Sequence, residues 1–146
     1  MRAVLDANIF ASALMRPQGP PGRVLALLLR ERAFELVLSP AIAEEVRRAL
    51  QYSRVRKRID ATDEEMDIWL ASLEIVAVPV EGSVEVKAVA ADLEDDKYLA
   101  AAVEGMAEFV VSGDGHLLAL GTYEGIRIVN ARSFLEMLRV LSGKHG

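Results

Sequence analysis

The residues Arg2-Ala3-Val4-Leu5-Asp6 form a short apolar run that ends in a carboxylate. Such a run is typical of a strand in a parallel sheet, because both faces of that sheet are covered and apolar residues need not alternate with polar ones. Similar runs recur along the chain at Phe34–Leu38, Ile75–Val80, Phe109–Ser112 and Arg127–Val129. Helical segments separate the runs without hairpin spacing. We therefore expect one α/β domain over residues 1–146, with helices on both faces of a parallel sheet of about five strands.

The segments between these runs carry helix signals. Ser39 and Thr62 are N-cap residues, Thr62 forms a capping box with Glu65, and Ser133 with Glu136 predicts a second box for the last helix. Pro79 indicates an edge position for the third strand. Helices are expected at Ile9–Met15, Arg23–Arg32, Pro40–Leu50, Asp63–Leu73 and Lys97–Glu104, and a Pro- and Gly-rich loop is expected at Arg16–Gly22.

Composition bounds the class of protein. Apolar residues make up 52% and charged residues 27%, which is ordinary for a globular domain. No apolar run could span a bilayer and no leader sequence opens the chain, so we expect a cytoplasmic protein without a membrane partner. The chain has no cysteine, which excludes disulfides, thiolate zinc sites and a cysteine nucleophile.

Four acidic clusters interrupt the apolar chain: Asp6, Glu44-Glu45, Glu94-Asp95-Asp96 and Asp114. Asp6 ends the first expected strand, and Asp114 follows the fourth. Parallel strands end at the same edge of a sheet, where ligands gather in such folds. Glu44 or Glu45 can point inward from its helix. Each cluster also has an ordinary interpretation as a turn, a cap, a solvated helix face or the charge of a helix start.

Carboxylates gathered in a dry site repel one another and lose hydration, so they need a compensating cation. Ligands that are all oxygen suit a hard ion such as Mg²⁺ or Mn²⁺. Such an ion can hold a phosphodiester oxygen and lower the pKa of an attacking water. The predicted chemistry is metal-assisted phosphodiester hydrolysis.

Four stretches, in order, resemble the motifs of the PIN-domain (PilT N-terminus) ribonucleases. Val4-Leu5-Asp6-Ala7-Asn8 resembles the opening strand with its first acid, and Ser39–Val46 resembles the serine-to-glutamate helix, which puts a ligand at Glu45. Asp95–Ala102 resembles the third acidic block, with Asp95 aligned as the ligand and a shift to Asp96 open. Val111–Asp114 resembles the closing strand, with Ser112 as its hydroxyl and Asp114 as the fourth acid.

The resemblance implies a PIN-like α/β/α sandwich and a Mg²⁺- or Mn²⁺-dependent endoribonuclease. The implied catalytic residues are Asp6, Glu45, Asp95 and Asp114; the implied metal ligands are these four and Asp96; and the implied supporting residues are Asn8, Ser39 and Ser112. Many members are toxins of toxin–antitoxin pairs, so the implied partners are RNA, an antitoxin protein and a second copy of the chain in a homodimer or higher homo-oligomer. His116 stands where many members carry another acid, and it is either a surface loop residue or a group that tunes the metal or a phosphate.

Basic residues are concentrated in the segment after Glu45. Residues 1–59 hold 11 Lys and Arg against 5 Asp and Glu, whereas residues 60–146 hold 6 against 17. The candidates for RNA binding are Arg47, Arg48, Arg54, Arg56 and Lys57. They either hold RNA phosphates near the metal without reading bases or form a solvated face that balances the acidic segment Thr62–Asp67.

Two other functions remain open. The chain could be a catalytically inactive PIN-like domain that binds RNA or a protein and uses its acids structurally. A phosphoryl-transfer domain with Asp6 as nucleophile ranks last, because the second aspartate of such sites, two residues after the first, is replaced here by Asn8.

Overall fold

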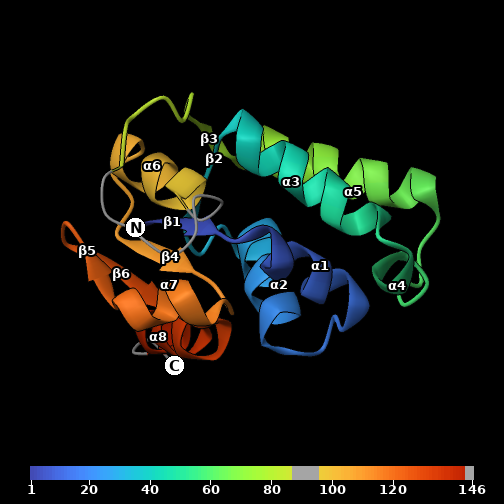
Figure 1. Ribbon diagram of the computed structural model, residues 1–146. Helices are drawn as coiled ribbons and strands as arrows, with labels where there is room; N and C mark the ends of the chain where they lie inside the picture. Colours follow the sequence, from blue (N-terminus) through green and yellow to red (C-terminus); the bar gives the residue numbers. More distant parts are fainter. Residues whose placement is uncertain (87–95, 144–146) are drawn as a thin grey trace.

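Figure 1 shows a computed structural model of the protein, which describes residues 1–86 and 96–143. A six-stranded sheet runs through the described part of the chain in the order β3-β2-β1-β4-β6-β5. Its strands are β1 (Arg2–Leu5), β2 (Glu35–Leu38), β3 (Val78–Pro79), β4 (Phe109–Val111), β5 (Thr122–Tyr123) and β6 (Ile126–Val129). Every neighbouring pair is parallel except β5 with β6. The predicted α/β fold with a central parallel sheet is confirmed, although the sheet has six strands instead of about five and its last pair is antiparallel.

Helices flank this sheet, as Figure 1 shows. They are α1 (Ala7–Met15), α2 (Pro20–Glu31), α3 (Pro40–Gln51), α4 (Ser53–Arg56), α5 (Asp63–Val76), α6 (Asp96–Glu104), α7 (Gly115–Leu120) and α8 (Ala131–Gly143). α1 packs against α2 and α3, α2 packs against α8, and α6 contacts β1 and β4. Within the described ranges no helix is both long enough and apolar enough to cross a membrane.

The centre of the sheet positions the acidic residues. In the register of β1 with β4, Val4 lies beside Val110 and Leu5 beside Val111, and all four side chains are fully buried. The Asp6 backbone N–H donates to the Val111 carbonyl at 2.9 Å, so pairing extends one residue past β1. The residues that follow the two strands therefore leave the sheet at the same edge.

Several predicted boundaries are wrong for local reasons. α5 continues to Val76, so the predicted strand Ile75–Val80 shrinks to Val78–Pro79, although its place at the sheet edge is confirmed. α2 begins inside the predicted loop, with prolines at its first two positions. Proline is tolerated there because the first N–H groups of a helix have no partner within the helix, so their absence costs no hydrogen bond.

The last helix has a different cap from the predicted one. α8 begins at Ala131, and the side chain of Asn130 accepts from the Ser133 backbone N–H at 2.8 Å. The Ser133–Glu136 capping box is therefore wrong. The Thr62–Glu65 box of α5 is confirmed, with both of its hydrogen bonds present.

Candidate functional site

A hydrogen-bonded chain joins the ends of β1 and β4. Asp6 is only 4% exposed, and its Oδ2 accepts from the Ser112 hydroxyl at 2.7 Å. The Ser112 Oγ accepts in turn from the Asp114 backbone N–H at 2.9 Å. Asp6 Oδ1 accepts from the Asn8 N–H at 3.0 Å and so caps α1. Ser112 thus holds Asp6 and the backbone of Asp114 at one edge of the sheet.

The charge on Asp6 has no cation beside it in the described part of the chain, where this residue forms no ion pair. A buried carboxylate is costly unless hydrogen bonds or an opposite charge compensate it. Among the described residues, the Asn8 N–H and the Ser112 hydroxyl donate hydrogen bonds to the Asp6 carboxylate, and both donors are neutral. Each carboxylate oxygen can accept more than one hydrogen bond. Asp6 therefore retains the capacity to bind a cation.

Tyr98, in the first turn of α6, lies between two of the predicted acids. Its hydroxyl oxygen accepts from the Ala7 backbone N–H at 3.2 Å. Burial raises the pKa of Tyr98 well above its ordinary range, and the negative charges of Asp6 and Glu45 raise it further against the opposing Ala7 hydrogen bond. Both carboxylates therefore act on one phenol, which stays neutral and protonated.

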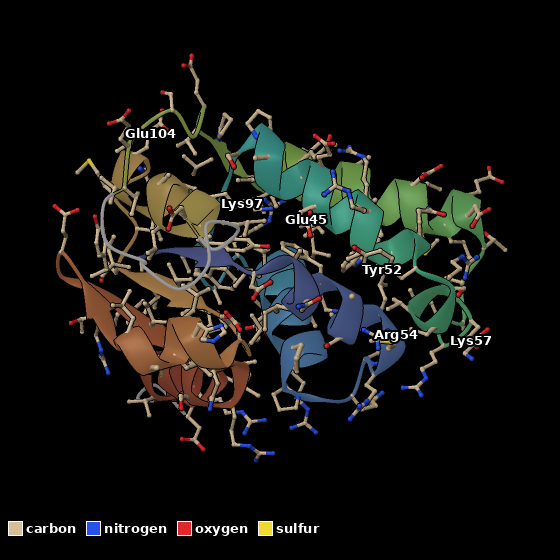
Figure 2. The ribbon with its side chains drawn as sticks, viewed as in Figure 1. Glu45, Tyr52, Arg54, Lys57, Lys97 and Glu104 are labelled. Atoms are coloured by element: carbon tan, nitrogen blue, oxygen red, sulfur yellow. The ribbon has the colours of Figure 1, made fainter. Side chains whose placement is uncertain are left out.

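Glu45 turns toward α6, whereas Glu44 turns to solvent. The Glu45 side chain is 23% exposed against 73% for Glu44. Glu45 Oε2 lies 2.7 Å from Arg48 Nη1 and 3.6 Å from Lys97 Nζ. Figure 2 shows Glu45 and Lys97 close together, between α3 and α6. The structure thus distinguishes the two glutamates, which the residue pattern alone left equivalent.

Asp96 and Asp114 stand at helix starts near the same edge. Asp96 opens α6, and its Oδ1 is buried without a hydrogen-bond partner among residues 1–86 and 96–143. Asp114 is the N-cap residue of α7 and lies 3.9 Å from His116 through Oδ1 and Nδ1. His116 is 65% exposed, so it lies at the surface. Asp95 lies outside the described residues.

The side chains described do not form a closed metal cage. Among residues 1–86 and 96–143, no group of three or more histidine, aspartate or glutamate side chains is arranged to hold one ion. The contacts that do exist link Asp6 with Ser112 and Asp114, and place Asp6 and Glu45 around Tyr98.

The supporting residues have distinct places. Ser39 is 2% exposed, and its Oγ accepts from the Ile42 N–H at 3.3 Å, which caps α3 and so positions Glu45 in the second turn. Asn8 is exposed on α1 and supplies the backbone N–H that Asp6 accepts.

Sequence reasoning missed Lys97 and Tyr98 as members of this region. One signal was available, because a lysine in the first turn of a helix opposes the helix macrodipole and needs a nearby anion. Glu45 is that anion. No local pattern indicated Tyr98, since its contacts with Ala7 and Asp6 span about ninety positions of sequence.

The five predicted RNA-binding residues divide into two groups. Three are paired with acids: Arg47 with Glu74, Arg48 with Glu44 and Glu45, and Arg56 with Asp63. Arg54 and Lys57, on and just after α4, are exposed and form no ion pair within the described ranges. The balancing role proposed for this basic segment therefore applies to Arg56, which pairs with an acid of the segment Thr62–Asp67.

Similarity to known proteins identifies the family of this chain. A family model described as PIN domain matches residues 2–116, which include every acidic cluster discussed above. An uncharacterized protein of Methanocaldococcus jannaschii is 29% identical over 120 residues, which cover 82% of this chain and 75% of that protein. No solved structure matches the chain. The chain therefore belongs to the PIN-domain family, whose members are usually nucleases.

Proposed function

We propose that this protein is an endoribonuclease that uses Mg²⁺ or Mn²⁺ to hydrolyse RNA phosphodiester bonds. One observation carries the proposal: a buried Asp6 carboxylate without an ion pair to any described residue, joined through the Ser112 hydroxyl to the backbone of Asp114. Adjacent parallel strands bring these residues to the edge where such folds bind ligands.

The donor set fits a hard divalent ion. The residues that would hold it are Asp6, Glu45, Asp95, Asp96 and Asp114. The buried Oδ1 of Asp96 accepts no hydrogen bond from the described residues. When bound, the ion supplies Lewis-acid stabilisation of the phosphodiester and a lower pKa for an attacking water.

The chain's own residues hold the carboxylates in place. Ser112 fixes the relative position of Asp6 and Asp114 through two hydrogen bonds. Tyr98 donates its hydroxyl hydrogen toward Asp6 and, because its pKa is raised, does so throughout the physiological pH range. Lys97 and Arg48 orient Glu45.

Replacement of single acids tests the proposal. Asp6→Asn, Asp95→Asn and Asp114→Asn should each reduce RNA cleavage by orders of magnitude and leave the fold intact or more stable, because one like charge leaves a crowded site. Glu45→Gln should lose activity, whereas Glu44→Gln, its exposed neighbour, is the matched control and should keep it. Cleavage should stop in EDTA, and calorimetry should detect Mn²⁺ binding to the wild type and to Glu44→Gln but not to the variants that lose a ligand.

Cleavage that persists in Asp6→Asn or in EDTA would contradict the proposal. The alternative is a catalytically inactive PIN-like domain that binds RNA or a protein, and the lack of a closed cage among the described side chains favours it as the second candidate. It predicts that the acid variants unfold or weaken binding while the wild type cleaves nothing.

We further propose that residues 1–146 form a single PIN-like domain and that the protein is a cytoplasmic, homodimeric toxin held inactive by an antitoxin. Family membership supports this part of the proposal. Growth arrest on expression, its relief by the product of a neighbouring gene, and the mass of the purified protein by light scattering test it.

A further inference from the structure

An aromatic side chain is exposed at the end of the helix that carries Glu45. Tyr52 is the C-cap residue of α3 and is 49% exposed. Within residues 1–86 and 96–143 its ring packs on no other aromatic ring and its hydroxyl forms no hydrogen bond. A single exposed apolar residue is ordinary, so its position decides whether it has a role.

Tyr52 follows Glu45 by seven residues. Seven residues make about two helical turns, so the two residues lie on the same face of α3 and are about 10 Å apart along its axis. Figure 2 shows Tyr52 beyond Glu45 along α3, on the same side of the helix. A few nucleotides of extended RNA would span the distance between the carboxylates and the Tyr52 ring.

Cations follow Tyr52 immediately. Arg54 is on α4 and Lys57 is its C-cap residue, three residues later, so the two lie on the same side of this turn. Both are exposed and neither forms an ion pair in the described part of the chain, in contrast to Arg47, Arg48 and Arg56. Figure 2 places Arg54 and Lys57 at the end of α3 where Tyr52 lies.

We propose that Tyr52, Arg54 and Lys57 form a subsite for single-stranded RNA a few nucleotides from the scissile phosphate. A base stacks on the Tyr52 ring, and the two cations contact the phosphates around that base. Such aromatic and basic combinations bind single strands with little sequence preference, because every base has a π-face. A duplex would keep its bases stacked and unavailable to the ring. The subsite rests on the proposed ribonuclease function, since Glu45 defines the cleavage end.

The test uses Asp6→Asn protein in EDTA, so that binding is measured without cleavage. The probe is a fluorescein-labelled oligoadenylate, and anisotropy is measured over a range of salt concentrations. Tyr52→Ala should weaken binding about 5- to 140-fold without changing the salt dependence, and Tyr52→Phe should restore it. Arg54→Ala with Lys57→Ala should reduce the slope of log K against log salt by about 1.4, or about 0.7 for each lost phosphate contact.

Controls separate stacking from other effects. Ile75→Ala removes an apolar side chain that is 82% exposed on α5 and should leave binding unchanged. Duplex RNA and polyglutamate of matched charge should show no Tyr52-dependent affinity. The stacking role would be overturned if Tyr52→Ala bound RNA as tightly as the protein with Tyr52, or if Tyr52→Phe lost as much affinity as Tyr52→Ala. Tyr52-dependent binding of polyglutamate as tight as that of RNA would assign the surface to an acidic protein segment instead.

A parallel cleavage assay with the wild-type acids and Mg²⁺ distinguishes the two proposals. If cleavage occurs but Tyr52→Ala changes neither binding nor KM, the subsite is wrong and the nuclease stands. If no RNA is cleaved but binding still depends on Tyr52, the ribonuclease proposal fails while the binding surface stands.

Discussion

Ser112 shows how one buried hydroxyl can organise two acids. It is fully buried, donates to Asp6 and accepts from the Asp114 backbone. Asp6 uses its other oxygen to cap α1, so each of its two oxygens accepts one hydrogen bond from a neutral donor. The interpretation of Asp6 as a helix cap is therefore confirmed without excluding the functional one.

Ser112→Ala should destabilise the protein by about 1–3 kcal/mol, because Asp6 loses a buried donor and the Asp114 N–H loses its acceptor. Cleavage should fall as well, since the two acids lose their common anchor. Urea unfolding and the RNA assay measure the two effects. Ser53→Ala removes an exposed serine hydroxyl on α4 and is the control. Unchanged stability in Ser112→Ala would show that the hydroxyl does not hold the acids together.

At the level of elements, α3 and α6 form the two sides of the candidate site. α3 presents Glu45, and the first turn of α6 presents Lys97 and Tyr98 to it. The pair between Glu45 and Lys97 is only partly exposed, at 23% and 18%. Lys97 is therefore a competitor for the Glu45 carboxylate if Glu45 binds the proposed ion.

Lys97→Met should strengthen Mn²⁺ binding by up to about fivefold, because a competing cation near Glu45 is removed. The same variant should be slightly less stable in EDTA. Calorimetry and thermal unfolding measure these effects. Lys57→Met makes the same change of charge on the exposed segment after α4 and should alter neither. Equal metal affinity in Lys97→Met and wild type would show that the pair does not compete with the ion.

α5 starts at a capping box whose strength depends on pH. Hydrogen bonds from the backbone and side chain of Thr62 lower the pKa of Glu65 below its ordinary value of 4.5. A folded-state pKa below the unfolded one contributes stability above the unfolded value, and this contribution is lost as the pH falls through the folded one.

Glu65→Gln should therefore flatten the loss of stability as the pH falls below the ordinary glutamate value of 4.5, because glutamine keeps an acceptor that does not titrate. Urea unfolding at several pH values measures this. Glu64→Gln, in the same turn but outside the capping box, is the control. If the stability of Glu65→Gln and Glu64→Gln fell equally with decreasing pH, Glu65 would not be the cause of the acid dependence.

For the whole molecule, a bound divalent ion would link segments that are far apart in sequence. An ion that binds only the folded state stabilises it by about 2.7 kcal/mol at a concentration of 100 times its Kd. Mn²⁺ should therefore raise the Tm of the wild type, EDTA should reverse the rise, and Asp6→Asn should abolish it. An equal rise in Asp6→Asn would place the ion elsewhere.

The parts of the fold that local signals specify were predictable. β1, β2 and β4 each contain three consecutive apolar residues, and the starts of α3 and α5 carry Ser39 and Thr62 caps. The parts that lack such signals were missed. β5 has only two residues, and its hairpin depends on positive φ angles at Glu124 and Gly125. α7 has only six residues, too few for a helical period.

By itself the sequence determined the succession of the longer strands and helices, the Ser39 and Thr62 caps and the candidate acids at the strand ends, because these depend on neighbours a few residues away. The tertiary structure alone decided that Ser112 bonds Asp6 across 106 positions, that Glu45 and not Glu44 faces α6, and that Lys97 and Tyr98 join them. It also separated the ion-paired arginines from Arg54 and Lys57. These contacts join residues that are far apart in sequence, and they form only when the folded sheet brings the ends of its strands together.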